Sequence, residues 1–277
     1  MAIFKKIGKR LSKAYYKEPK MTHEEWATKK VYFPSQDISP ILGYFKIKFS
    51  PQYKLLFKLM DRPDVHTLFA KWASQSGKSL FEMLIIGYRL DNEPANVLYM
   101  QPIKDDIPKV LRLKINPVLK CIKDLWQKFE DYIATEGIRS KDAIKQLAGG
   151  SLVVSGSSVK ERKSLTVPLL VMDEIGEFDK GAVKEASERL KAFSKFFPKK
   201  IGVSTIVHPK DEICTNFENC EAIIEWRYEC PNCKDNFYPS RETFKFMTKK
   251  EFAGLNNIPE NEVEKSSWKK EALKNVY

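Results

Sequence analysis

The sequence has no long hydrophobic run and few cysteines, and both absences narrow its class. No apolar stretch reaches the roughly 18 residues that are needed to span a bilayer. The N-terminus also lacks the uninterrupted apolar segment and the small-residue cleavage site of a secretory signal. The five cysteines are an odd number, which fits a reducing compartment better than a disulfide framework. We therefore expect a soluble, intracellular protein without a membrane partner.

The sequence has fewer acidic than basic residues. The 277 residues include 48 lysines and arginines against 36 aspartates and glutamates, which gives a formal net charge of +12. This balance favours an anionic partner such as nucleic acid, with a solvated basic surface as the alternative. The excess is concentrated in the first thirty residues, so residues 1–50 are predicted to form a basic arm. Within it, Ile3, Phe4, Ile7 and Leu11 have the spacing of a short amphipathic helix, and a solvated tail is the other interpretation.

Internal repeats and low-complexity tracts are absent as well, and from residue 49 onward apolar segments with strand and helix patterns alternate. Such alternation is typical of a mostly parallel sheet sandwiched by helices, an α/β fold. The apolar runs predict strands and helices as follows: strands over 65–70, 97–100, 152–155, 167–172 and 200–206, and helices over 78–89, 109–133 and 182–193.

A glycine is missing from the most informative motif, which follows the first of these strands. The segment Trp72-Ala73-Ser74-Gln75-Ser76-Gly77-Lys78-Ser79 matches the phosphate-binding pattern G-x-x-x-x-G-K-[ST] except that Trp72 replaces the first glycine. Gly77 lets backbone N–H groups close on phosphate oxygens, Lys78 reaches the β- and γ-phosphates, and Ser79 offers its hydroxyl to Mg²⁺. A turn before a surface helix with an exposed lysine is the alternative. The predicted ligand is a nucleoside triphosphate, held by Ser74, Gln75, Ser76, Gly77, Lys78, Ser79 and Leu80.

An acidic pair provides the second half of such a site. The apolar run Leu169 to Met172 ends in Asp173 and Glu174. NTPases hold Mg²⁺ with a carboxylate, which we expect at the tip of a strand beside the one that feeds the phosphate loop, and hydrolases use a second acid to orient water. We therefore expect Asp173 to hold the metal and Glu174 to act as the catalytic base. An acid at the end of an apolar strand is common on its own, but both motifs together predict hydrolysis.

Three further features fit a hydrolytic nucleotide site. Ser204 and Thr205 end the next strand, where they can sense the γ-phosphate and couple hydrolysis to movement; a simple strand-end cap is the alternative. Gln52 can present its amide to adenine. A basic loop holds Arg162 and Lys163, and a guanidinium delivered to the γ-phosphate accelerates hydrolysis by about 10³ to 10⁵. A surface loop that contacts water or DNA phosphate would have the same composition.

In this order, the motifs make the chain resemble the large terminase subunit of tailed bacteriophages, in particular the lambda-type family. The resemblance runs from about residue 49 to 246 and rests on the phosphate loop, the turn at Gly149-Gly150, the basic loop, the acidic pair and Cys230-Pro231-Asn232-Cys233. It implies a P-loop NTPase of the RecA/ASCE type that uses ATP and Mg²⁺. It also implies roles for individual residues: Lys78, Glu174 and Arg162 in catalysis, with Lys163 one position from the finger, Ser79 and Asp173 at the metal, and Ser204 and Thr205 in coupling.

The resemblance further implies an ATPase motor that translocates double-stranded DNA into a procapsid in the host cytoplasm. Its expected partners are the small terminase subunit, the portal and further copies of itself in a ring. The expected domains are the arm over 1–50, the ATPase core over 51–210 and an extension over 211–277 that ends before a nuclease domain, so nuclease activity is not expected here. A superfamily-2-like DNA helicase or translocase and a non-hydrolysing DNA-binding scaffold protein are the alternative functions.

The cysteines Cys230 and Cys233 have the spacing of half a tetrahedral zinc site. The resemblance suggests that the matching pair lies beyond Tyr277, and Cys214, Cys220 or His208 are substitutes without a known ligand spacing. Two reduced cysteines in a turn are the alternative.

Overall fold

The computed structural model describes residues 21–102, 107–136, 143–158, 165–230 and 233–237. The chain divides into two compact units, Met1–Ile223 and Ile224–Tyr277. In the second unit, β9 (Tyr228–Glu229) pairs with β10 (Asn236–Phe237) as a short antiparallel ribbon. Among the described residues, no helix combines the length and the apolar character that a membrane crossing requires.

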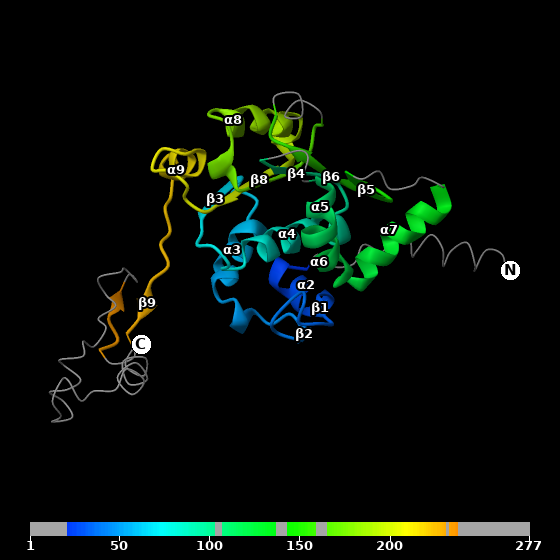
Figure 1. The fold of residues 1–277 in the computed structure, drawn as a ribbon, viewed down its shortest axis with the longest axis horizontal. Coiled ribbons are helices and arrows are strands. Elements are labelled where there is room, and N and C mark those ends of the chain that lie inside the picture. Colours follow the sequence, from blue (N-terminus) through cyan, green and yellow to red (C-terminus); the bar gives the residue numbers. More distant parts are fainter. Residues whose placement is uncertain (1–20, 103–106, 137–142, 159–164, 231–232, 238–277) are drawn as a thin grey trace, which may run out of the picture. The chain divides into compact units, whose positions relative to one another are not determined.

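The first unit is built on a six-stranded sheet with the order β3-β8-β7-β4-β6-β5 (Figure 1). Every neighbouring pair is parallel except β5 with β6, so the predicted mostly parallel sheet is confirmed. The edge strand β5 was not predicted, because its short mixture of polar and apolar residues resembles a loop. The strands are β3 (Thr67–Lys71), β4 (Asn96–Gln101), β5 (Ile144–Leu147), β6 (Gly150–Gly156), β7 (Leu169–Asp173) and β8 (Lys199–Ser204).

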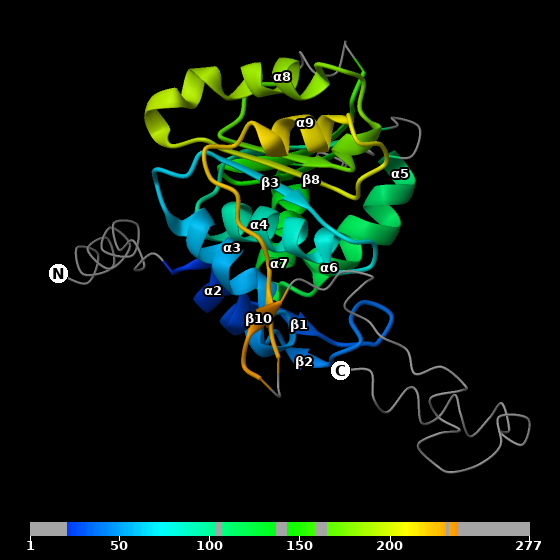
Figure 2. The same ribbon diagram turned by 90° about the vertical axis from the view of Figure 1, so that its left-hand side faces the viewer.

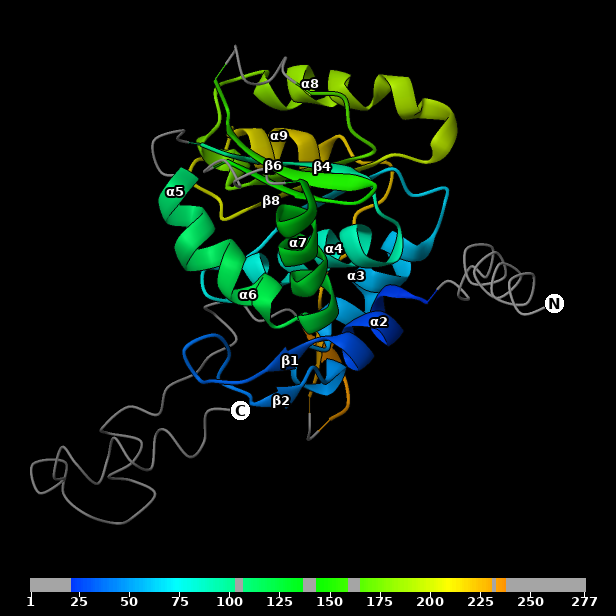
Figure 3. The same cartoon turned by 90° about the vertical axis from the view of Figure 1, so that its right-hand side faces the viewer.

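Helices cover both faces of this sheet, which confirms the predicted sandwich. Helices α8 and α9 lie on one face, and α3, α4, α6 and α7 lie on the other (Figures 2 and 3). Along β7, Leu169 and Val171 pack toward α4, whereas Leu170 and Met172 pack toward α8 and α9. All residues of β7 are buried, as expected for a strand covered on both faces. The helices are α3 (Gln52–Asp61), α4 (Lys78–Asn92), α5 (Ile107–Val110), α6 (Asn116–Lys120), α7 (Lys123–Glu136), α8 (Ala182–Ser187) and α9 (Glu212–Glu218).

The helical stretch predicted over 109–133, which Pro117 was expected to interrupt, consists of several pieces. After α5, residues Leu111–Ile115 form a π-helical segment, and Pro117 lies in the first turn of α6. A second break separates α6 from α7. The apolar spacing predicted helical structure here, but it did not reveal the wider turn of the π-helix. Similarly, the predicted helix over 182–193 consists of α8 and a 3₁₀ segment, Glu188–Phe196.

Part of the predicted arm packs against the core. Helix α2 (His23–Lys30) contacts α3 and α4, and it is followed by the small ribbon of β1 (Tyr32–Phe33) and β2 (Gly43–Tyr44). Trp26 is fully buried and donates a hydrogen bond from Nε1 to Asp91 at 2.8 Å. A Cβ on Gly87 of α4 would lie 2.9 Å from the Trp26 ring, so the glycine permits this close packing. The amphipathic helix predicted within residues 1–20 lies outside the described residues.

Candidate nucleotide site

The order of the strands corrects one expectation about the site. We expected the strand with the acidic pair to lie beside the strand that feeds the phosphate loop, but β8 lies between β3 and β7. The sequence could not show this insertion, because β8 follows both strands along the chain. As a result, Ser204 and Thr205, at the end of β8, lie between the phosphate loop and the acidic pair.

The phosphate loop runs from the end of β3 to the start of α4 at Lys78. Gln75 and Gly77 adopt the left-handed backbone region, with φ of 56° and 92°. A Cβ on Gly77 would lie 2.4 Å from the Tyr53 hydroxyl, which donates a hydrogen bond to the Gly77 carbonyl at 2.5 Å. Ser76 Oγ donates to the Ala73 carbonyl at 2.5 Å. The loop therefore has a defined turn in which Gly77 is required both for its backbone and for its lack of a side chain.

Trp72, which replaces the first glycine of the motif, packs between two helices. Its ring meets Tyr53 of α3 edge-on at 5.9 Å and Phe81 of α4 at 5.7 Å. Its backbone N–H donates to the Ser204 carbonyl at 2.9 Å. Gln52, predicted to face adenine, donates from Nε2 to the Ser76 carbonyl at 3.4 Å. The base of the loop is thus held by aromatic packing and by hydrogen bonds to its carbonyls.

Lys78, Glu174 and the end of β8 meet in one cluster. Lys78 Nζ lies 3.3 Å from Glu174 Oε1, and the lysine is 7% exposed. The other carboxylate oxygen, Oε2, lies 3.2 Å from each of three donors: Ser204 Oγ, Thr205 N and Thr205 Oγ1. Glu174 also has a φ of 49°, a region that non-glycine residues occupy at a cost and mainly at functional sites. The fold therefore brings the predicted phosphate-binding lysine, the base and the coupling residues together.

Asp173 belongs to a second cluster, which the sequence analysis missed. Its Oδ2 accepts a hydrogen bond from Tyr99 Oη at 2.8 Å and forms an ion pair with Lys114 Nζ. Lys114 Nζ also lies 3.6 Å from Glu82 Oε2, and Glu82 is fully buried. Glu82 could have been noticed, because it is an acid on a helix that is otherwise apolar on almost every side. Lys114 lies in the π-helical segment, and single turns of π-helix are frequent at functional sites.

Burial and neighbouring charges shift the pKa values in this cluster. Burial raises the pKa of Glu82 well above its usual value, and the Asp173 carboxylate raises it further. Burial alone would lower the pKa of Lys114, but Glu82 and Asp173 more than offset this and leave it raised. Burial also raises the pKa of the Tyr99 hydroxyl, with both carboxylates adding to the effect. Lys114 is therefore held as a cation between two acids.

The side-chain oxygens of this cluster suit a magnesium ion that also binds phosphate. Both Glu82 carboxylate oxygens and Asp173 Oδ1 are buried without a hydrogen-bond partner. Carboxylate and hydroxyl oxygens, including that of Ser79, are the hard ligands that Mg²⁺ prefers, and the ion is usually bound through one or two carboxylates plus phosphates. Within the described residues, no group of three or more His, Cys, Asp or Glu side chains is arranged to hold a metal. The protein oxygens thus fit Mg²⁺ when phosphates supply the remaining ligands.

The structure supports neither the predicted arginine finger nor the predicted zinc site. Arg162 and Lys163 fall within residues 159–164, outside the described ranges. Cys230 lies in a turn, in which its N–H donates to the Asp235 carbonyl at 2.8 Å and its carbonyl accepts from Lys234 at 2.9 Å. Because the described residues contain no metal-binding group of three or more His, Cys, Asp or Glu side chains, they give zinc at Cys230 and Cys233 no support.

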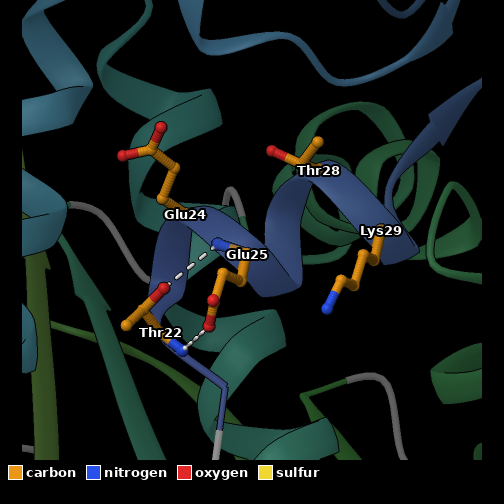
Figure 4. A pocket seen from close by; sticks show the side chains of 5 residues that line it. All are labelled: Thr22, Glu24, Glu25, Thr28 and Lys29. Atoms are coloured by element: carbon orange, nitrogen blue, oxygen red, sulfur yellow. Dashed lines mark hydrogen bonds between the residues drawn. The ribbon is translucent and has the colours of Figure 1, made fainter.

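A surface hollow on α2 contains none of the predicted site residues (Figure 4). It is lined by Thr22, Glu24, Glu25, Thr28 and Lys29, and two of these form the helix cap. Thr22 Oγ1 accepts from the Glu25 N–H at 3.2 Å, and the Glu25 carboxylate accepts from the Thr22 N–H at 3.0 Å. This reciprocal pair is a capping box, so the polar groups there serve the start of the helix.

The chain is similar in fold to a phage large terminase of known structure. The large terminase of bacteriophage HK97 matches with a TM-score of 0.55 and 12% identity, over 91% of this chain and 50% of that protein, so the chain spans half its length. The ATPase domain of the Thermus phage P74-26 large terminase matches with a TM-score of 0.43 and 15% identity, over 62% of this chain and 72% of that domain. The likeness to the HK97 protein shows a shared fold. No curated protein matches.

A family model gives the assignment that fold similarity alone does not. The model described as phage terminase large subunit gpA, ATPase domain, matches residues 39–270, which is most of the chain. This confirms the resemblance that the motifs indicated. The chain belongs to the family of ATPase domains of the phage terminase large subunit gpA.

Proposed function

We propose that the chain binds ATP with Mg²⁺ and hydrolyses it to translocate double-stranded DNA into a procapsid. The observation that carries this proposal is the cluster of Lys78, Glu174, Ser204 and Thr205 at the carboxyl edge of the sheet. It joins the proposed phosphate-binding lysine, the proposed base and two polar groups at the end of the intervening strand β8. Membership in a terminase ATPase family supports DNA packaging as the use of the hydrolysis.

In the proposed mechanism, Lys78 leaves its ion pair with Glu174 and binds the β- and γ-phosphates. Glu174, still held by Ser204 and Thr205, is then free to orient a water molecule toward the γ-phosphorus and to accept its proton as the bond to ADP breaks. Ser79 and Asp173 would hold Mg²⁺, which neutralises charge on the phosphates when it is bound. Exchange of partners by Lys78 therefore links nucleotide binding to release of the base.

The remaining parts of the motor are proposed from the family and from charge. Arg162, supplied by an adjacent copy in a ring, is the proposed arginine finger, and Gln52 the proposed adenine contact. The basic arm is proposed to meet the small terminase subunit, and the net charge of +12 favours DNA as a partner. The portal is the proposed docking partner of the ring.

The test compares nucleotide binding and ATP turnover in the wild type, Glu174→Gln and the exposed neighbour Glu177→Gln. Turnover is measured with DNA present, and binding with a fluorescent ATP analogue and Mg²⁺. Glu174→Gln should lose turnover by about 10²-fold or more and keep nucleotide binding, because only the proton acceptor is removed. Glu177→Gln should behave as the wild type.

Two outcomes would favour the alternative functions. Nucleotide binding without turnover in the wild type, in the presence of DNA and procapsid, would favour a scaffold protein. Turnover that is stimulated by single-stranded DNA ends and not by procapsid or portal would favour a helicase. Full activity in Glu174→Gln would overturn the assignment of the base.

A further inference from the structure

The ammonium group of Lys114 occupies the space between two carboxylates at the proposed metal site. It pairs with Asp173 and lies 3.6 Å from Glu82, while Tyr99 donates to the same Asp173 oxygen. The side chains of Asp173 and Glu82 are 9% and 0% exposed, so water contributes little to their charge balance. Lys114 is the cation that the described residues place against both acids.

This arrangement leaves carboxyl oxygens of Asp173 and Glu82 without hydrogen bonds. Three of the four carboxyl oxygens of the pair are buried without a hydrogen-bond partner, and one of these three, Glu82 Oε2, has only the Lys114 ammonium at 3.6 Å. Buried acceptors without a partner are costly, and the Lys114 ammonium, although it has three N–H donors, hydrogen-bonds only to Asp173 among the described residues and lies 3.6 Å from Glu82. Most buried polar side-chain atoms in folded proteins have a hydrogen-bond partner, so oxygens without one call for an explanation. The geometry resembles a divalent cation site in which a lysine supplies the positive charge.

We propose that Lys114 is the resident cation of the Asp173–Glu82 pair and makes divalent metal binding depend on nucleotide. The inference rests on the proposed function, since it assigns a positioning role at the same site. Without nucleotide, a metal ion must displace the ammonium and gains only two carboxylates. With a triphosphate bound, the phosphates add ligands for the metal and offer the displaced ammonium a new anionic partner. Lys114 has a long flexible stem that permits such a change of partner.

The experiment measures Mn²⁺ binding in the absence of nucleotide, by the loss of the free-ion electron paramagnetic resonance signal. The variants are Lys114→Met, which keeps the length of the side chain and removes its charge, and the matched control Lys109→Met, an exposed lysine in α5 of the same helical stretch. Lys114→Met should bind Mn²⁺ about tenfold or more tightly than the wild type, because the competing cation is gone. Lys109→Met should not differ from the wild type. The double variant Lys114→Met with Asp173→Asn should lose the gained affinity.

A purely structural role for Lys114 predicts a different result. Lys114→Met would then unfold more easily, and its folded form would bind Mn²⁺ no better than Lys109→Met; that result would overturn the proposal. If Lys114→Met is marginally stable, thermal unfolding with increasing Mn²⁺ replaces the resonance measurement. A rise in Tm with Mn²⁺ in this variant, and none in the wild type, is then the expected result, and equal responses would overturn the proposal.

The same samples separate this inference from the proposed function. Binding of the fluorescent ATP analogue by the wild type with Mg²⁺ tests the nucleotide site, and the Mn²⁺ measurements without nucleotide test the role of Lys114. Failure of the wild type to bind the analogue would contradict the proposed function. The Mn²⁺ affinities measured without nucleotide would still test the role of Lys114. Normal analogue binding with no metal difference between the two methionine variants would contradict the role of Lys114 alone.

Discussion

Two regions hold the phosphate loop, and they do so by different physical means. Toward α3 and α4, the loop rests on the rings of Tyr53, Trp72 and Phe81. Toward the carboxyl edge of the sheet, it meets the ion pair of Lys78 with Glu174, with Ser204 and Thr205 behind it. Aromatic packing contributes stability through buried area and ring geometry, whereas buried ion pairs contribute little net stability. We infer that aromatic packing determines the position of the phosphate loop, whereas the charged groups determine its chemistry.

The division predicts which property each region controls. Substitutions on the aromatic side should lower the free energy of unfolding and weaken nucleotide binding together, because both depend on the loop conformation. Substitutions on the charged side should change turnover or metal binding with smaller effects on unfolding.

Trp72→Ala should have the largest effect. It removes the contacts of Trp72 with Tyr53 and Phe81, and we expect the free energy of unfolding in urea to fall by about 2 kcal/mol. This is less than the roughly 3–5 kcal/mol for a tryptophan in a core, because Trp72 is half-buried. The affinity for an ATP analogue should fall as well. Trp126→Ala on α7 is the matched control, since that half-buried ring meets Phe129 edge-on, away from the loop. Equal analogue affinity in both variants would break the link between packing and the loop.

Ser204→Ala should have a smaller effect, confined to turnover. The Ser204 hydroxyl lies 3.2 Å from Glu174 Oε2 and 2.7 Å from the Thr205 carbonyl, which share its one proton, and it accepts a hydrogen bond from the Gly176 N–H at 3.0 Å. Without it, the carboxylate keeps the N–H and the hydroxyl of Thr205, the residue after β8, and we expect kcat to fall about tenfold with little change in KM, because the base is less well positioned. Ser187→Ala on α8, whose hydroxyl donates to the Val183 carbonyl, controls for loss of a serine hydrogen bond elsewhere. A rise in KM at unchanged kcat would assign Ser204 to binding.

The smallest expected effect is a pH dependence on the aromatic side. His23 stacks on Tyr88 at 3.7 Å and its Nδ1 lies 2.5 Å from Asp61. Burial lowers the pKa of His23 below its usual 6.5, although Asp61 acts in the opposite direction.

The folded state therefore binds this proton less readily than the unfolded state does. The stabilising contribution of neutral His23 is fully present above about pH 6.5, the pKa of the unfolded state, and is lost as the pH falls toward the lower pKa of the folded state. The loss amounts to roughly 1.4 kcal/mol for each unit by which the two pKa values differ. Urea unfolding of the wild type and of His23→Gln between pH 7.5 and 5.5 measures the difference, and the wild type should lose more stability. Parallel pH curves would show that His23 does not titrate in this way.

The predicted strands and the phosphate loop came from local signals. Apolar runs such as Leu169 to Met172 and the residues from Gly77 to Ser79 carry their physical reasons within a few neighbouring positions, so the sheet and its loop could be anticipated. The position of β8 between β3 and β7 could not, because the order of strands depends on contacts between segments that are far apart in the sequence. Trp72 was also unexplained until Tyr53 and Phe81 were placed around it.

The sequence by itself determined that this protein is an α/β chain with a phosphate loop, an acidic pair and a basic charge, because residue type, periodicity and spacing are local properties. The tertiary structure alone decided that Ser204 and Thr205 hold Glu174, and that Lys114 lies between Asp173 and Glu82. Lys114 and Asp173 are 59 residues apart in the chain, and charge pairing at that separation depends on how the helices and strands pack.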